Sequence, residues 1–393
     1  MKASPHELVG VRVLRTLDRV DWVLVLLAIT LALIGWMFVR SATLTDSRYA
    51  SLPAKQAVVL CIAGAVALAV VFVPYLKIAR YAWLVYGAAI VALLLLPFLG
   101  TNVNGATRWF RLPGFAVQPA EVAKLGLILA LASYLRFRSK AKTLDGLLVP
   151  VVIAGVPALL VLRQPDLGSS LVFWPVLLAM CYAAGVPSRS LLVLIGAGVL
   201  ALAAAWFVMH DYQQDRIVAW GQHFLWDEHD PETSKEVREV IRGDGYQPWQ
   251  ALIAIGSGGW SGFGIGEGPQ NRYDFLPYRF DDYVFAVIAE ETGWLGAVGL
   301  LGLYAMMVLG LFGIALRTRE RFGRLLVVGV AAYLGTQVLV HAAVCTWLVP
   351  ATGLPMPLIS YGGSGTLVAA VALGLALNVG AHREPVLSSD GFA

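Results

Sequence analysis

The sequence predicts an all-α protein that crosses a membrane about ten times. Of its 393 residues, 58% are hydrophobic and only 14% are charged, whereas soluble domains carry about 25% charged residues. The hydrophobic residues gather in repeated segments of about 20 residues, which is the length that a helix needs to cross a bilayer. Together these observations indicate a polytopic membrane protein.

Ten apolar segments are candidates for these crossings. The segment at 147–162 is short and contains two prolines, so we expect a kinked or broken helix there. The segment at 283–316 is longer than one crossing needs, so we expect it to tilt or to begin outside the hydrocarbon. The ten segments are 22–39, 56–74, 81–99, 119–135, 147–162, 169–186, 190–209, 283–316, 325–349 and 365–381.

Loop charges predict the orientation of the chain. Cytoplasmic loops are enriched in Lys and Arg, and one alternate set of loops, which includes both termini, carries most of these residues. We therefore expect an even number of crossings and both termini in the cytoplasm. The basic residues of this set are Arg12, Arg15, Arg19, Lys77, Arg80, Arg136, Arg138, Lys140, Lys142, Arg189, Arg317, Arg319, Arg321, Arg324 and Arg383.

The same assignment places one large loop, 210–282, on the extracytoplasmic side. It is longer than an ordinary connection, which indicates a functional loop, and its polar middle has a helix-like pattern around 233–242. No segment has the composition of a separate soluble domain, so residues 1–393 are expected to form one transmembrane domain. The tail after Arg383 is expected to be disordered.

Composition also excludes several classes of function. Cys61, Cys181 and Cys345 each stand alone in an apolar run, a pattern typical of neither a metal site nor a disulfide. The net charge of +4 is small and the basic residues flank apolar segments, so nucleic acid is not an expected partner. The first apolar segment lacks a small-residue cleavage site and is expected to be an anchor rather than a signal peptide.

The first motif, NGATRWFRLPGFAVQPAEVAKL at 104–125, combines a turn, an aromatic anchor and a helix start. Asn104-Gly105 is typical of a turn. Trp109 lies between Arg108 and Arg111, as expected at a membrane interface. This part of the motif is therefore expected outside the hydrocarbon.

The second half of this motif predicts a helix with a charged pair. Gln118 precedes Pro119, which suits the first turn of a helix, and Glu121 and Lys124 follow on one helix face. An isolated charge at membrane depth costs about 2.5–3.5 kcal/mol. We therefore expect either a self-neutralising structural pair or a polar wall of a cavity that opens to the outside.

The third motif, RQPDLGSS at 163–170, is a short polar link between two apolar segments. Pro165 and Gly168 supply a turn, and Asp166 is a candidate helix cap. A structured hairpin and a role in binding substrate are both compatible with this pattern.

A glycine-rich run and an acidic pair follow at 250–296. The glycines at 256–268 match neither a P-loop nor a dinucleotide-binding fingerprint, so we expect them to allow close backbone approach at the membrane surface. Asp281 and Asp282 lie where the next helix should begin, and only one of them can be its N-cap. Glu290 and Glu291 lie inside the next span and are expected to pair with Lys124 or with backbone donors.

The last motif, PATGLPMPLISYGGSGT at 350–366, interrupts the helices between the final two spans. Irregular backbone at membrane depth is tolerated where it is buried or lines a cavity, so we expect a second wall of the same pocket. His341, in the preceding apolar segment, is expected to be a hydrogen-bonded core histidine rather than a ligand.

These motifs, together with DYQQDRI at 211–217, resemble the SEDS family of bacterial shape, elongation, division and sporulation proteins. They occur in the same order as in the family, and the resemblance covers nearly the whole chain. The run GEGPQNRYDFLP at 266–277 and the opening Asp21-Trp22 favour the rod-shape (RodA-like) branch over the division (FtsW-like) branch. The family's essential aspartate falls on Asp282. Phe280 and Asp281 replace the usual His-Thr, and Tyr278 replaces the usual Glu, so Asp281 competes for the role of base.

The resemblance implies a multi-pass protein of the bacterial inner membrane, a peptidoglycan glycosyltransferase whose active site faces outward. It implies that lipid II is polymerised into undecaprenyl-diphosphate-linked glycan for elongation and cell shape, beside a class B penicillin-binding transpeptidase and other elongation-complex membrane proteins. No cofactor is certain, and a divalent cation, Mg or Mn, stays open. The candidate pocket residues are Arg108, Trp109, Gln118, Glu121, Lys124, Gln270, Arg272, Arg279, Ser360, Gly362, Gly363 and Ser364.

Three functions remain alternatives at this point. The first is glycosyl transfer with inversion, in which an aspartate acts as the base and cations receive the diphosphate. A lipid II flippase is the second, although the two halves show no matching interrupted segments of the kind that transporters carry. The third is a scaffold for a transpeptidase, which would make the carboxylates of the pocket dispensable.

Overall fold

The computed structural model describes residues 16–103, 106–112, 115–137, 144–224 and 238–382. Several sequence features lie outside these residues. They are Arg12, Arg15, Arg138, Lys140, Lys142 and Arg383, the turn at Asn104-Gly105, the part of the large loop at 225–237, and the C-terminal tail.

Each of the ten predicted segments contains a helix. Among the residues that the structure describes, seven helical stretches are long and apolar enough to cross a membrane. The helices α6 and α8 and the stretch Gly146–Leu162 of α7 are shorter, so the count of ten crossings stays a prediction. The helices are α2 (Trp22–Ser41), α3 (Leu52–Val71), α5 (Ala82–Leu99), α6 (Pro119–Leu135), α7 (Leu144–Leu162), α8 (Leu167–Ala183), α9 (Ser188–Ala205), α14 (Val284–Arg317), α15 (Arg321–Cys345) and α16 (Gly363–His382).

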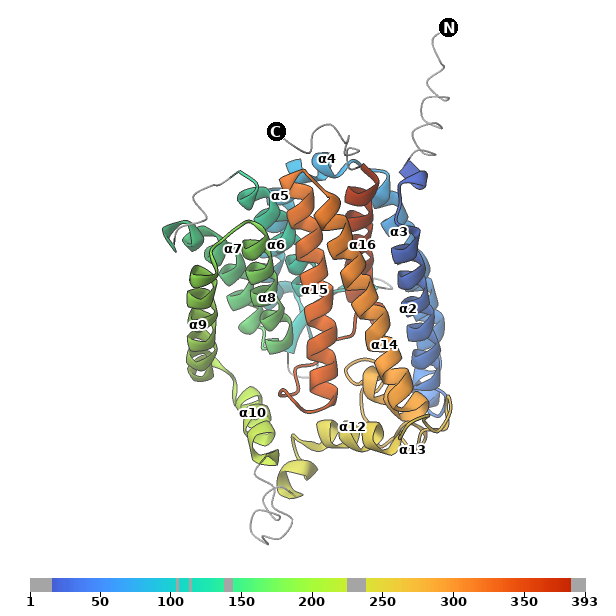
Figure 1. Cartoon of the computed structure of the whole chain (residues 1–393). Coiled ribbons are helices and arrows are strands. Elements are labelled where there is room, and N and C mark those ends of the chain that lie inside the picture. The colour runs from blue at the N-terminus through green and yellow to red at the C-terminus, as the bar shows by residue number, and fades with distance from the viewer. Residues whose placement is uncertain (1–15, 104–105, 113–114, 138–143, 225–237, 383–393) are drawn as a thin grey trace.

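Shorter helices lie at the two ends of this bundle. Figure 1 shows α2 beginning and α16 ending at the same end, as an even number of crossings requires, with α4 (Tyr75–Arg80) beside them. At the opposite end lie α10 (Asp211–His223), α12 (Tyr246–Ser257) and α13 (Pro269–Arg272) of the large loop. The short 3-10 helices η1 (Ser47–Tyr49) and η3 (Trp206–Val208) also lie at this end, and residues 238–242 of the large loop are helical.

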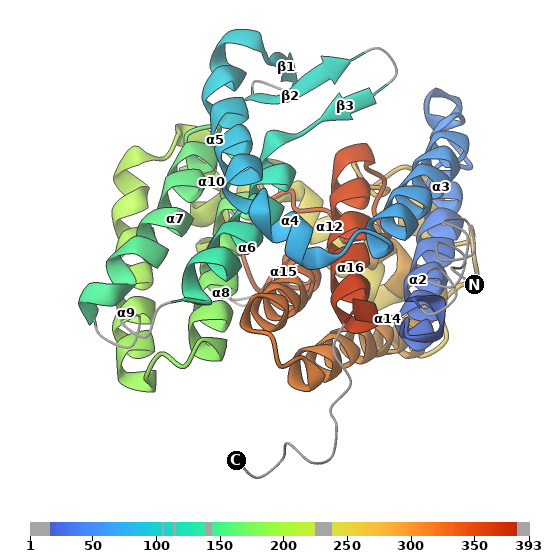
Figure 2. The same ribbon diagram turned by 90° about the horizontal axis from the view of Figure 1, so that it is seen from above.

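The expectation of an all-α fold is wrong in one place, where a small antiparallel sheet interrupts the helices. Its strands are β1 (Thr101–Val103), β2 (Ala106–Leu112) and β3 (Phe115–Val117), in the order β1-β2-β3. Trp109 pairs with Thr101, and Phe110 pairs with Val117. The strand β2 is rich in β-branched and aromatic residues, which favour strands. Figure 2 shows the sheet between the ends of α5 and α3.

The centre of the bundle is formed by α15 and α16, most of whose side chains are buried, whereas α3 and α9 are largely exposed. α16 packs along α3, and Gly374 faces the main chain of Ala67, where a Cβ would lie only 2.7 Å from the carbonyl oxygen. A side chain at this position would push the two helices apart.

Helix α14 is broken at Gly293, whose backbone is left-handed with φ 69° and ψ −170°. The part before the break, Val284–Glu291, is buried throughout, and the part after it begins with exposed Trp294 and Leu295. The surplus length of the predicted segment at 283–316 is thus a separate buried helical piece that precedes the exposed, apolar one.

Candidate active site

A cavity of about 1460 Å³ opens at the end of the bundle that carries the large loop. It brings together segments that are far apart in the sequence: α3, the sheet, the link between α7 and α8, α10, the turn before α14, and the irregular segment before α16. Its polar lining residues are Lys55, Arg108, Trp109, Arg111, Gln118, Asp166, Tyr212, Arg216, Gln247, Tyr278, Asp281, Asp282, Gln337, Thr352, Ser360, Tyr361 and Thr366.

Asp281 and Asp282 both line this cavity and are partly exposed to it. They lie in the turn before α14, whose N-cap is Tyr283 without a side-chain cap, so the N-cap interpretation is wrong for both carboxylates. The Ser360 hydroxyl donates a hydrogen bond to the Asp281 carbonyl at 2.6 Å, and the Tyr361 amide donates to the Phe280 carbonyl at 2.8 Å. The irregular segment therefore holds the acidic turn in place, as a second wall of the pocket should.

The environment of Asp282 makes it a stronger base than an ordinary aspartate. Burial raises its pKa to about 6, although the cations of Arg216 and Arg108 oppose this shift. Burial, and then the Asp282 charge, raise the pKa of Asp281 well above its usual value. Desolvation of the Asp282 carboxylate thus outweighs the effect of the nearby positive charges on its pKa.

Arg108 lines the cavity, but its guanidinium is largely occupied by protein atoms. Nε donates to the Gln164 carbonyl at 3.0 Å, and Nη2 donates to the Pro165 carbonyl and to the Tyr212 hydroxyl at 3.1 Å. The Tyr212 hydroxyl in turn donates to the Pro165 carbonyl at 2.7 Å. Arg108 thus clasps the sheet, the α7–α8 link and α10 together.

Arg216, on α10, is the cation that sequence analysis did not single out. It is half-buried in the cavity wall and acts on the pKa of Asp282 more strongly than Arg108 does. Its Nη1 donates a hydrogen bond to the Ala351 carbonyl at 3.3 Å. Its guanidinium carbon lies 5.7 Å from the centre of the Tyr212 ring. The DYQQDRI motif contained this signal, but only the tertiary fold brings α10 to the acidic turn.

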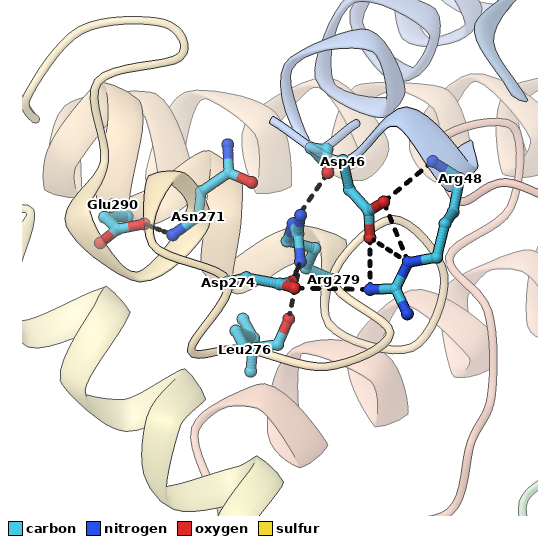
Figure 3. A network of polar contacts seen from close by, with 8 residues as sticks. Asp46, Arg48, Asn271, Asp274, Leu276, Arg279 and Glu290 are labelled. Carbon is cyan, nitrogen blue, oxygen red and sulfur yellow. Dashed lines mark hydrogen bonds and ion pairs between the residues drawn. The ribbon is translucent and has the colours of Figure 1, made fainter. Parts of the chain in front are cut away.

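Three candidates from the large loop do not line the cavity. Arg279 is 1% exposed, donates to the Ala42 carbonyl at 2.8 Å and pairs with Asp274, so its charge serves the loop itself (Figure 3). Arg272 pairs with Glu267 on the surface. The main-chain amide of Gln270 donates to the Glu290 carboxylate at 2.7 Å. The expectation that these residues face the pocket is wrong, because local partners bind the two arginine side chains and the main chain of Gln270 outside it.

Glu121 and Lys124 form a buried ion pair behind the cavity wall. Lys124 Nζ lies 2.6 Å from Glu121 Oε1, and each side chain is 1% exposed. The Tyr333 hydroxyl donates to Glu121 Oε2 at 3.3 Å. Neither charge lines the cavity, so of the two expectations the structure favours the self-neutralising pair. Gly365 lines the cavity in front of the pair, and a Cβ added at this glycine would contact the Glu121 carboxyl group.

The short link between α7 and α8 serves both as a cap and as a wall. Asp166 Oδ1 accepts a hydrogen bond from the Ser169 amide at 3.0 Å, which confirms the predicted helix cap. Its other oxygen accepts from Gln118 Nε2 at 3.0 Å, and both side chains line the cavity. Ser364 lies one layer behind, where its hydroxyl accepts from the Gln118 amide.

The other candidate pocket residues lie in the cavity wall, whereas the candidate core histidine lies in the protein interior. Trp109, Ser360, Gly362 and Gly363 line the cavity. His341 is a buried core residue, with Nδ1 2.8 Å from the Leu354 carbonyl, as expected.

Glu290 and Glu291 are hydrogen-bonded by the large loop and by Ser41 of α2 rather than paired with Lys124. Glu290 accepts from the amides of Gln270 and Asn271, and Glu291 accepts from the Ser41 hydroxyl and the Asn271 side chain. Among the residues that the structure describes, no three His, Cys, Asp or Glu side chains come together as a metal site.

Comparison with known proteins shows to which family this chain belongs. The family model described as "Cell cycle protein", which is named for FtsW, RodA and SpoVE, matches residues 19–385. The chain belongs to this family. A probable peptidoglycan glycosyltransferase FtsW from Trichlorobacter lovleyi is 33% identical over 94% of this chain and 96% of its own length. Another, from Halomonas elongata, is 35% identical over 91% and 89%.

Solved structures of the family share the fold. A chain from a study of polymerization and crosslinking by a peptidoglycan synthase complex has a TM-score of 0.75 and 32% identity, over 93% of this chain and 99% of that one. The rod shape determining protein RodA of Thermus thermophilus has a TM-score of 0.67 and 32% identity, over 93% and 98%. The chain is therefore a multi-pass membrane enzyme of the glycosyltransferase type found in this family.

Proposed function

We propose that this chain polymerises lipid II into glycan strands at the outer face of the bacterial cytoplasmic membrane. The observation that carries the proposal is Asp282, a carboxylate with a raised pKa at the wall of a large cavity, which Arg216 and Arg108 also line. A base and an anion-receiving group on one cavity are what glycosyl transfer from a diphosphate requires.

In the proposed reaction, a sugar hydroxyl of one substrate attacks the anomeric carbon of the other. Asp282 takes the hydroxyl proton as the new glycosidic bond forms and the bond to the diphosphate breaks with inversion. The diphosphate leaves as an anion and needs no proton if cations receive it. Asp281 lies beside the base and is the alternative proton acceptor.

The diphosphate is proposed to meet Arg216 first, because Arg108 is occupied by main-chain carbonyls. We expect Arg216→Ala to lower kcat/KM for lipid II by about 10- to 100-fold, the value of one charge-assisted hydrogen bond. The measurement is a time course of polymer formation by the purified protein in detergent.

Arg272→Ala is the matched control, since Arg272 is an exposed arginine of the same loop that pairs with Glu267 outside the cavity. Its kcat/KM should stay close to that of the unmodified protein. Equal losses in both variants would show that the assay senses general loop charge rather than an anion site at Arg216.

The raised pKa of Asp282 predicts the pH dependence of this reaction. A general base works only when it is deprotonated, so kcat/KM should rise about tenfold per pH unit below pH 6 and level off above it. Steady-state polymerisation between pH 4.5 and pH 8 tests this. An acid limb centred near pH 4 would mean that the working base is an ordinary, hydrated carboxylate.

The names of the relatives favour one branch of the family. The curated relatives reported above are named FtsW, which supports a division-type polymerase more than the rod-shape role expected from the sequence. We therefore propose that a class B penicillin-binding transpeptidase of cell division is its partner. Complementation of host cells depleted of either their division or their elongation polymerase would distinguish the branches.

One experiment distinguishes the polymerase function from the rival flippase function. Purified protein is placed in liposomes that hold fluorescent lipid II, with and without a cognate transpeptidase. The proposal expects glycan polymer from lipid II of the accessible leaflet. Transfer of lipid II between leaflets without any polymer would overturn it.

A further inference from the structure

An exposed apolar patch lies where the glycine-rich run meets the break of α14. It consists of Trp260, Phe263, Ile265, Trp294 and Leu295, whose exposed fractions are 72%, 48%, 53%, 55% and 59%. The ring centres of Trp260 and Trp294 lie 5.2 Å apart, in an edge-to-face contact. The sequence carries no charged residue between Asp244 and Glu267. Such a surface is unsuited to bulk water.

The patch is a built feature, because the loop replaces the helical hydrogen bonds that α14 loses at its break. The amides of Phe263 and Gly264 donate to the carbonyls of Glu290 and Glu291 at 3.2 and 2.9 Å. In return, the amide of Trp294 donates to the Gly259 carbonyl at 2.8 Å.

Glycine is required for this fit. A Cβ on Gly262 would collide with the main chain of Glu291, and its φ is +72°. The loop and the helix are therefore joined by close main-chain packing at this point.

The position of the patch along α14 matches a membrane boundary. The helix from Trp294 to Arg317 extends about 36 Å at about 1.5 Å per residue, slightly more than the hydrocarbon thickness of about 30 Å. Exposed Leu309 and Leu316 continue the apolar surface along this length, and Arg317 ends it. With a cationic end at one interface, Trp294 falls at the other, where tryptophan is enriched.

We propose that this patch is an anchor that lies in the headgroup–acyl boundary of the outer leaflet and fixes the height of the large loop. Its occupant is the lipid surface, because the patch is uncharged, carries two indoles and continues the lipid-facing side of α14. The Glu290 carboxylate binds the amides of Gln270 and Asn271, so the anchored unit also holds the segment that leads to the acidic turn.

Labelling tests this placement without any measurement of activity. Cys61 is the exposed cysteine, and Cys181 and Cys345 are buried, so a Cys61→Ser background leaves few reactive thiols. In this background Phe263→Cys carries a bimane label in phosphatidylcholine–phosphatidylglycerol nanodiscs. Asp215→Cys, at an exposed polar position of α10, is the control.

Lipids with a doxyl group near the headgroup should quench the label at 263 several-fold more than the label at 215, and aqueous iodide should show the reverse. Equal iodide quenching at both positions would overturn the anchor. If the label at 263 becomes protected only when a transpeptidase is added, the patch is a protein interface and the proposal is also overturned.

Discussion

Asp282→Asn is expected to lower lipid II polymerisation by about 10²- to 10⁴-fold, the usual contribution of a positioned general base. The amide has nearly the same shape as the carboxylate but cannot accept the hydroxyl proton. Asp282 caps no helix and forms no ion pair within 4 Å among the described residues, so the fold should persist. The measurement is polymer formation from purified lipid II, with thermal unfolding followed in parallel.

Asp281→Asn is the matched control, because it removes a neighbouring carboxylate from the same turn. It should keep most of the activity if Asp282 is the base. Loss with Asp281→Asn and retention with Asp282→Asn would move the base by one residue. Retention in both variants would contradict a carboxylate mechanism and support a scaffold role.

The largest effect on stability is expected at the buried ion pair. Lys124→Met leaves the Glu121 carboxylate, which is 1% exposed, without its cation. Removal of one partner from a buried pair typically lowers the free energy of unfolding by about 3–5 kcal/mol. Thermal or denaturant unfolding in detergent, followed by tryptophan fluorescence, measures this change.

Two further variants separate charge from packing. The double variant Glu121→Gln/Lys124→Met removes both charges and should recover much of the lost stability. Lys55→Met makes the same substitution at an exposed position and should stay within about 0.5 kcal/mol of the unmodified protein. An unchanged unfolding midpoint for Lys124→Met would mean that Glu121 takes up a proton without penalty.

The membrane class, the ten helical segments and the family could all be predicted from the sequence alone. Long apolar segments have no alternative in a bilayer, because every main-chain hydrogen bond must be made within a helix or a closed barrel. The motifs at 163–170 and 350–366 also indicated where the helices are interrupted. The motif at 350–366 was correctly expected to line a pocket, since irregular backbone at that depth needs protein or water around it. For the motif at 163–170 the sequence left a structured hairpin and a role in binding substrate both open.

The tertiary structure decided which charges face the pocket. Arg272 and Arg279 lie close to Asp282 in sequence, yet Glu267, Asp274 and the Ala42 carbonyl bind them elsewhere. Arg216, more than 60 residues before Asp282, reaches the acidic turn because Arg108 and Tyr212 clasp α10 to the α7–α8 link.

Contacts between distant segments were also needed to place the start of α14 and the small sheet. Sequence patterns place an aspartate at a helix start, but only the fold shows that Tyr283 takes the cap position and that burial raises the pKa of Asp282. The strands β1 and β3, which pair with β2, have three residues each and are too short to show a clear alternation. Local patterns fix what a segment can form, whereas the partner of a charge depends on contacts between segments distant in the chain.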